Sequence, residues 1–172
     1  MNKASKYLKS SGSIETLEIG NLVDLVISDA IEAGSSDIHI EPWDASLVVR
    51  VRLNGVLQEL LHLPIELMEK VSGRLKVMAN LVSYEMDRPQ EGHAQTGAEM
   101  GGVELRMSFF PVIRGNHAGG VLRGEKIVIR IFDPNKRSFN LDEIGFEDAT
   151  LKSLKKLLAK PSGMILLTGP TG

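Results

Sequence analysis

An alternating apolar segment, the turn Asn54-Gly55 and a second apolar-rich segment constrain the fold of this chain more than any other feature. The segment 47–53, LVVRVRL, alternates apolar side chains with arginines, which is the period of a strand with one buried face. Asparagine and glycine both tolerate a positive φ, as the central residues of a tight hairpin turn must. The segment 56–63, VLQELLHL, is therefore predicted to return as the antiparallel partner strand. The inward positions of the first strand are Leu47, Val49, Val51 and Leu53.

Three further segments have the periodicity of strands. They are 37–42, DIHIEP, then 103–110, VELRMSFF, and 126–132, KIVIRIF. Their inward residues are expected to be Ile38, Ile40, Val103, Leu105, Met107, Phe109, Ile127, Ile129 and Ile131. Because this inward set is uniformly apolar, we expect a packed core behind the sheet.

Apolar residues recur at helical spacing in two places. One helix is predicted over 17–31, with Gly34 as its stop, and a second over 65–81, opened by Pro64. Together with the strands, these helices define a helix-plus-antiparallel-sheet domain of the α+β class.

Two connections inside this domain are predicted to lack regular structure. The stretch 83–102 is polar and has little apolar content. The stretch 114–125 is glycine-rich and is interpreted as a long mobile loop. Such a loop could contact a partner, but surface loops tolerate changes of length at small cost, and a neutral insertion is preferred.

Composition indicates an ordinary soluble protein. Hydrophobic residues make up 42% and charged residues 24% of the 172 residues. The net charge of −2 provides no global field for nucleic acid or anionic lipid, so no nucleic-acid partner is expected. The absence of cysteine excludes disulfides and thiolate metal sites within this span. We find no run of about 20 apolar residues and no signal-peptide core, so a cytoplasmic location is expected.

The chain is expected to divide into four stretches. Residues 1–14 are polar and are interpreted as a disordered leader. Residues 15–132 contain the helix-plus-sheet domain. Residues 133–141, DPNKRSFNL, show no periodicity and are interpreted as an interdomain linker. Residues 142–172 contain a short helix and an apolar run, which we interpret as the start of a second domain.

The last residues resemble the opening of a phosphate-binding loop. The run 164–168, MILLT, has the length of a buried strand, and Gly169, Pro170, Thr171 and Gly172 follow it. The motif G-x-x-x-x-G-K-[ST] needs a lysine for the phosphates and a hydroxyl for Mg²⁺, and neither is in this sequence. The four residues could cradle phosphate through backbone N–H groups. The chain as given is expected to bind ATP weakly or not at all, and to be inactive alone.

Several motifs occur together in one order along the chain from about Leu17. They are SSDIHIEP, VRVRLNGVL, RLKVMANL, RPQEGH, GEKIVIRIFD, LDEIGF and PSGMILLTGPTG. In this order they resemble the secretion ATPase superfamily, and most closely the type II secretion and type IV pilus assembly ATPases. The half phosphate loop alone would be a weak signal, and the strength of the resemblance lies in the collinear set.

This resemblance implies a PAS-like domain at 15–132 followed by the beginning of a RecA-like motor domain. It implies a homo-hexameric parent that hydrolyses ATP with Mg²⁺ and moves an inner-membrane platform, so that pilin-like subunits are added or extracted. The parent would be cytoplasmic and peripheral at the inner membrane through its partners. Protein secretion and pilus roles both stay open, as do assembly and retraction.

Arg106 and Arg130 are the candidate catalytic residues. Each occupies the outward position of a strand whose neighbouring residues face the core. The resemblance implies that both reach toward bound nucleotide, where phosphoryl transfer needs cations near the γ-phosphate. Arginine suits this role because its planar fork is always charged and binds phosphate oxygens bidentately. The alternative is that each arginine is solvated or paired with a neighbouring carboxylate.

Other polar residues are given lesser roles. In the resembling family, the position of His93 often holds a third arginine and the position of Glu91 usually holds an aspartate. No essential phosphate role is therefore expected for His93. Arg88 could partly substitute for the missing arginine. His39 and Glu41 provide too few ligands for a metal, and no metal site is predicted.

Arg50 and Arg52 precede the hairpin turn on the outward side of their strand. From their position in the resembling family, we interpret them as residues at a subunit or domain interface.

Two other functions stay open. A ligand-sensing PAS-type module would share the fold and would need an internal cavity lined by convergent polar groups. A DNA-translocating relative from conjugation or DNA uptake would need a basic groove, which the near-neutral charge does not favour within this span.

Overall fold

The computed structural model describes residues 2–115, 121–133 and 140–169. Contacts divide the chain into two compact units, 1–132 and 133–172. The first unit is built on one antiparallel six-stranded sheet with the order β3-β2-β1-β6-β5-β4. The strands are β1 (Asp37–Pro42), β2 (Ser46–Leu53), β3 (Val56–Pro64), β4 (Gln90–Gln95), β5 (Glu104–Gly115) and β6 (Val121–Phe132). The α+β class predicted from the sequence is confirmed.

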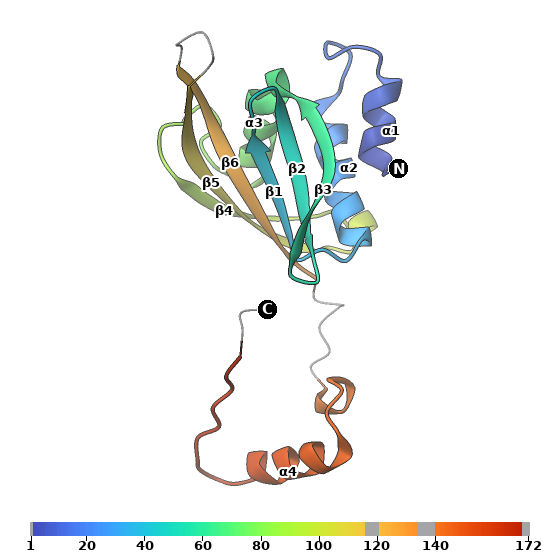
Figure 1. The fold of residues 1–172 in the computed structure, drawn as a ribbon, viewed down its shortest axis with the longest axis vertical. Coiled ribbons are helices and arrows are strands. Elements are labelled where there is room, and N and C mark those ends of the chain that lie inside the picture. The colour runs from blue at the N-terminus through green and yellow to red at the C-terminus, as the bar shows by residue number, and fades with distance from the viewer. Residues whose placement is uncertain (1, 116–120, 134–139, 170–172) are drawn as a thin grey trace. The chain divides into compact units, whose positions relative to one another are not determined.

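Helices cover one face of this sheet, as Figure 1 shows. They are α1 (Lys3–Ser10), α2 (Ile19–Glu32) and α3 (Met68–Met78), the last preceded by a short 3₁₀ turn at Ile65–Leu67. The apolar faces of α2 and α3 form one core with the inward strand residues. The largest fully buried apolar residues of this core are Leu22, Ile27, Ile38, Leu47, Leu67, Leu75, Leu105, Met107, Phe109, Ile127 and Ile129. The opposite face of the sheet, called the outer face below, carries the outward side chains.

The hairpin turn has the predicted geometry. Asn54 and Gly55 adopt φ values of 50° and 82°, and Leu53 pairs with Val56 across the turn. Because both central residues have positive φ, the turn matches the right-handed twist of the strands that it joins. The predicted inward positions of β2 are buried up to Val51, and Leu53 is partly exposed.

The expected disordered leader is wrong, because residues 3–10 form helix α1. The Asn2 side chain caps this helix by accepting a hydrogen bond from the Ser5 N–H (2.7 Å). The Asp29 carboxylate of α2 accepts two more, from the N–H groups of Lys3 (3.0 Å) and Ala4 (2.9 Å). First-turn N–H groups have no partner within a helix, so a buried carboxylate that binds them fixes α1 against α2.

Two connections contain strands that the sequence did not reveal. Strand β4 lies within the polar stretch 83–102, at the edge of the sheet, where its outward side chains are exposed. Two of its three inward residues are small, Gly92 and Ala94, and Gly92 lies where α3 ends: a Cβ at Gly92 would lie 2.8 Å from the Ala79 carbonyl oxygen. A strand with a glycine and polar residues has no apolar alternation to detect.

The predicted loop 114–125 is mostly strand. β5 continues to Gly115 and β6 begins at Val121, and the two pair along their whole length. Residues 116–120 lie outside the described residues. Glycine-rich composition therefore misled the prediction at 121–125, because pairing with a long neighbouring strand outweighs low intrinsic propensity.

The second unit contains a 3₁₀ turn at Leu141–Glu143 and helix α4 (Asp148–Leu158). The expected buried strand at 164–168 is not formed: the run has no strand assignment, and Met164 and Leu167 are more than 80% exposed. A strand needs a paired neighbour, and this unit has none within the described residues. Residues 134–139 of the predicted linker lie outside the described residues. In the part of the chain that the structure describes, no helix is long and apolar enough to cross a membrane.

Candidate functional site

A row of charged side chains crosses the outer face of the sheet. Arg106 on β5 lies directly opposite Arg130 on β6. His93 on β4 is opposite Arg106, and Asp37 on β1 is opposite Arg130. Arg52 on β2 continues the row beyond Asp37. The sequence placed the two candidate arginines on one face, and the strand register makes them direct neighbours.

Arg106 and Arg130 line one pocket of about 330 Å³. Their side chains are 55% and 66% exposed. The other residues around the pocket are Glu91, Gly92, His93, Met107, Ser108, Val128 and Phe132. Two guanidinium groups in an open pocket can bind an anion with several oxygens, such as a phosphate chain.

Each candidate arginine also pairs with a carboxylate, as the alternative interpretation expected. Arg106 donates from Nε to Glu104 Oε1 (3.1 Å), and its guanidinium carbon lies 4.4 Å from the centre of the Phe132 ring. Arg130 donates from Nε to Asp37 Oδ1 (3.2 Å). Both arginines are therefore held in place and still exposed, so pairing and anion binding are compatible.

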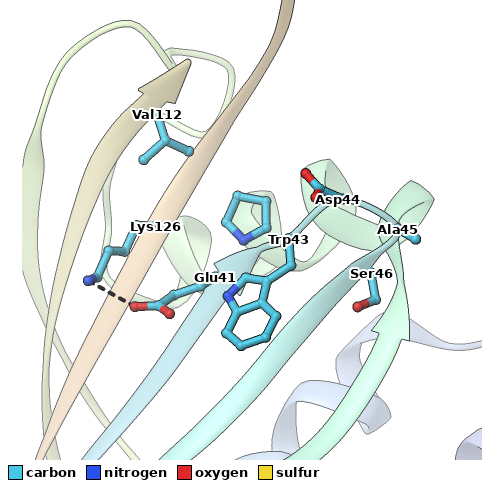
Figure 2. A pocket seen from close by; sticks show the side chains of 8 residues that line it. Glu41, Trp43, Asp44, Ala45, Ser46, Val112 and Lys126 are labelled. Atoms are coloured by element: carbon cyan, nitrogen blue, oxygen red, sulfur yellow. Dashed lines mark ion pairs between the residues drawn. The ribbon is translucent and has the colours of Figure 1, made fainter. Parts of the chain in front are cut away.

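Glu41 organises the other end of the outer face. Its carboxylate pairs with Arg50 and with Lys126, the latter at 2.8 Å (Figure 2). Burial, the largest single influence, raises the pKa of Glu41, but Lys126 and Arg50 together lower it below the ordinary value. Arg50 also lies over the Trp43 ring, 5.7 Å from its centre. The Arg50 guanidinium group is thus already paired with neighbouring side chains of its own domain.

A second pocket of about 580 Å³ lies beside this cluster (Figure 2). It is lined by Glu41, Pro42, Trp43, Asp44, Ala45, Ser46, Val112 and Lys126. Neither candidate arginine borders it, and its carboxylate at Glu41 already pairs with two cations. It is therefore separate from the site built around Arg106 and Arg130.

His39 sits between these two clusters with both ring nitrogens buried and without a hydrogen-bond partner among the described residues. Burial, and then the charge of Arg52, lowers its pKa below 6.5. As the pH falls through the ordinary histidine pKa, the unfolded chain gains a proton there before the folded chain does. The free energy of unfolding should therefore fall over this window.

We expect the variant His39→Asn to lose part of that pH dependence. The measurement is urea denaturation of both proteins between about pH 7.5 and about pH 5.5, where the natural protein should lose stability more steeply. The variant His62→Asn, at a half-exposed histidine, is the control. Equal slopes for the natural protein and His39→Asn would contradict the assignment.

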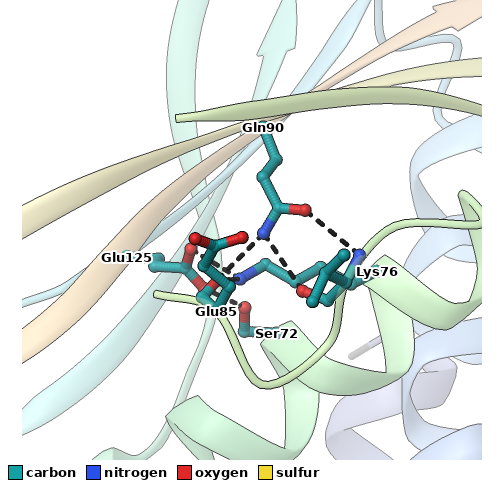
Figure 3. A network of polar contacts seen from close by, with 6 residues as sticks. Ser72, Lys76, Glu85, Gln90 and Glu125 are labelled. Atoms are coloured by element: carbon teal, nitrogen blue, oxygen red, sulfur yellow. Dashed lines mark hydrogen bonds and ion pairs between the residues drawn. The ribbon is translucent and has the colours of Figure 1, made fainter. Parts of the chain in front are cut away.

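A buried polar network lies under the sheet, on the side of the helices (Figure 3). Lys76 donates to Glu125 Oε1 (2.7 Å) and to the Glu85 carbonyl oxygen (2.6 Å), and the Lys76 and Glu125 side chains are fully buried. Ser72 donates to the second Glu125 oxygen. Gln90 donates to the same Glu85 carbonyl (2.9 Å). The network joins α3, β6 and the segment before β4, and so fixes the edge strand that carries His93.

Sequence reasoning missed this network, although one signal was present. Lys76 follows Leu75 and lies four residues after Ser72, on the face of the helix that turns to the core. A lysine on a buried helix face requires an anionic partner. The partner could not be found, because Glu125 was assigned to a loop.

Of the four residues predicted to begin a phosphate loop, the structure describes only the first. Gly169 is exposed and follows the unpaired run at 164–168, and Pro170, Thr171 and Gly172 lie outside the described residues. Among the described residues no group of three or more histidines, cysteines and carboxylates could hold a metal ion.

The sensory alternative expected an internal cavity, but the core encloses about 10 Å³ lined by apolar residues, no more than one water needs.

The fold and the site together define an α+β domain that presents cations on an exposed sheet face. A family model described as type II/IV secretion system protein matches residues 13–172. The type IV pilus assembly ATPase PilB of Myxococcus xanthus is 36% identical, over 88% of this chain and 25% of that protein. The type II secretion system protein E of Xanthomonas campestris pv. campestris is 38% identical, over 88% and 25% respectively. The chain belongs to the type II/IV secretion system protein family.

The chain spans about a quarter of the length of the curated relatives that it matches. Among solved structures, the Legionella pneumophila ATPase DotB aligns with a TM-score of 0.47 at 14% identity, over 78% of this chain and 34% of that one.

Proposed function

We propose that this chain is part of a motor ATPase that powers type II protein secretion or type IV pilus assembly, and that its outer face supplies Arg106 and Arg130 to the phosphates of bound ATP. The single observation that carries the proposal is the pairing of these arginines on β5 and β6 in one open pocket. Two adjacent cations match the charge that develops on a transferred phosphoryl group.

The remainder of the proposal concerns what the chain works with. ATP and Mg²⁺ are the cofactors, bound by a phosphate loop that begins at Gly169 and is completed by a lysine and a hydroxyl residue beyond this sequence. The 172-residue chain alone then has no ATPase activity. Residues 133–141 act as the hinge between a domain at 15–132 and a motor domain that begins near 142.

The partners follow from the relatives, which are named for type IV pilus assembly and for type II secretion. A homo-hexamer that acts on an inner-membrane platform fits this role, with the chain in the cytoplasm at that membrane. No nucleic acid is required, in keeping with a net charge of −2.

The proposal is tested by replacing each arginine in the full-length protein. Arg106→Ala and Arg130→Ala should each reduce ATPase turnover by about an order of magnitude or more, because each removes a cation from the transition state. Arg74→Ala is the matched control, since Arg74 lies on α3, whose apolar face packs against the core side of the sheet. ATPase turnover equal to that of the natural protein in both arginine variants would contradict the proposed mechanism.

A further inference from the structure

Each of the two candidate arginines donates to a carboxylate from its Nε atom. We propose that Asp37 and Glu104 are positioning residues, which fix Arg130 and Arg106 by their Nε atoms and leave the outer edges of the two guanidinium groups for phosphate. This inference rests on the proposed function and names two carboxylates that the reaction itself does not touch.

Asp37 is the stronger anchor. Its side chain is only 9% exposed and accepts from Arg130 Nε at 3.2 Å on one oxygen. The other oxygen lies 3.3 Å from Arg52 Nε and accepts from the Ser36 hydroxyl at 2.8 Å. A carboxylate fixed by two hydrogen bonds and one ion pair has little freedom, so it transmits the rigidity of the sheet to Arg130.

Glu104 plays the same part for Arg106 on strand β5. It accepts from Arg106 Nε at 3.1 Å and lies 3.8 Å from His93 Nδ1. The Phe132 ring below the guanidinium fixes the plane of the group. Glu104 is 48% exposed, so its hold on the arginine is weaker than that of Asp37.

The chemistry of arginine explains why these pairs do not block the pocket. A guanidinium carries five N–H donors in a fixed fork, and Nε contributes one of them. The Nη edge can bind two phosphate oxygens side by side. Both arginines line the pocket of about 330 Å³, whereas Asp37 and Glu104 do not. The carboxylates therefore hold the arginines from outside the space that a phosphate chain would fill.

The test is a double-mutant cycle on ATP turnover by the full-length protein. Asp37→Asn should lower turnover about tenfold, which corresponds to one charge-assisted hydrogen bond. In the background of Arg130→Ala, the same change should cost almost nothing further, because the group that it positions is gone. A purely structural role would lower turnover equally in both backgrounds and would overturn the inference.

The outcomes separate this inference from the proposed function. If Arg130→Ala lowers turnover and Asp37→Asn does not, the function stands and the positioning role is lost. If neither Arg130→Ala nor Arg106→Ala lowers turnover, both are lost. Glu104→Gln with Arg106→Ala repeats the cycle at an exposed position, so that a failure of Asp37→Asn to fold does not end the test.

A second readout uses the 172-residue chain and needs no nucleotide. The Nε–H resonances of Arg130 and Arg106 in ¹⁵N NMR spectra should exchange slowly with water, because both groups donate to carboxylates. Of these two signals, Asp37→Asn should accelerate exchange of the Arg130 Nε–H alone, and Glu104→Gln that of the Arg106 Nε–H alone. An unchanged Arg130 signal in Asp37→Asn would overturn the role of Asp37.

Discussion

Replacing Lys76 with methionine should lower the free energy of unfolding by about 3–5 kcal/mol, since it leaves the buried Glu125 without a counter-charge. Both side chains are fully buried and their charged atoms are 2.7 Å apart. Methionine fills a similar volume but cannot donate to the carboxylate or to the Glu85 carbonyl oxygen. Ser72 still donates to Glu125, and this single neutral donor does not offset the desolvation of a buried charge.

Denaturation by urea or guanidinium measures this effect, and two further variants make it specific. Lys70→Met, at an exposed position of the same helix, should change stability by less than about 0.5 kcal/mol. The double variant Lys76→Met with Glu125→Leu should recover most of the loss, because an apolar pair of similar volume can replace a buried ion pair. If Lys76→Met behaves like Lys70→Met, the charges of the pair are not coupled.

The inner strands of the sheet could be predicted from the sequence because apolar and polar residues alternate along them. In β1, β2, β5 and β6, one face packs on helices and the other carries charges. The alternation of apolar and charged residues therefore predicts which side chains are buried. Strand β4 is different, since an edge strand with Gly92 facing the end of α3 can be polar throughout. Helix α1 was also missed, because its main anchor is the Asp29 carboxylate on another helix.

The candidate site was accessible only in part. Alternation placed Arg106 and Arg130 on the outer face, but it does not specify which residues lie opposite each other on strands that are distant in the sequence. That register puts the two arginines side by side and brings Asp37, from a strand more than 90 residues away, into contact with Arg130. Long-range pairing thus determines the geometry of the site.

Replacing Phe109 with alanine should cost about 3–5 kcal/mol of unfolding free energy, because it opens a large cavity in the core. The ring is fully buried on the inward side of β5. Its face also lies 5.4 Å from the Lys76 ammonium group, so the change removes a favourable contact from the buried network. Phe109→Ala and Lys76→Met should therefore be non-additive when they are combined.

The adjacent phenylalanine provides a matched control for this prediction. Phe110 is 43% exposed on the outer face, so Phe110→Ala removes the same ring at a cost of less than about 1 kcal/mol. The two residues are neighbours in sequence, and their difference in cost measures only which face of the strand each one occupies. Equal costs by denaturant titration would mean that β5 is shifted by one residue. Arg106 would then point into the core, where it could not reach a phosphate.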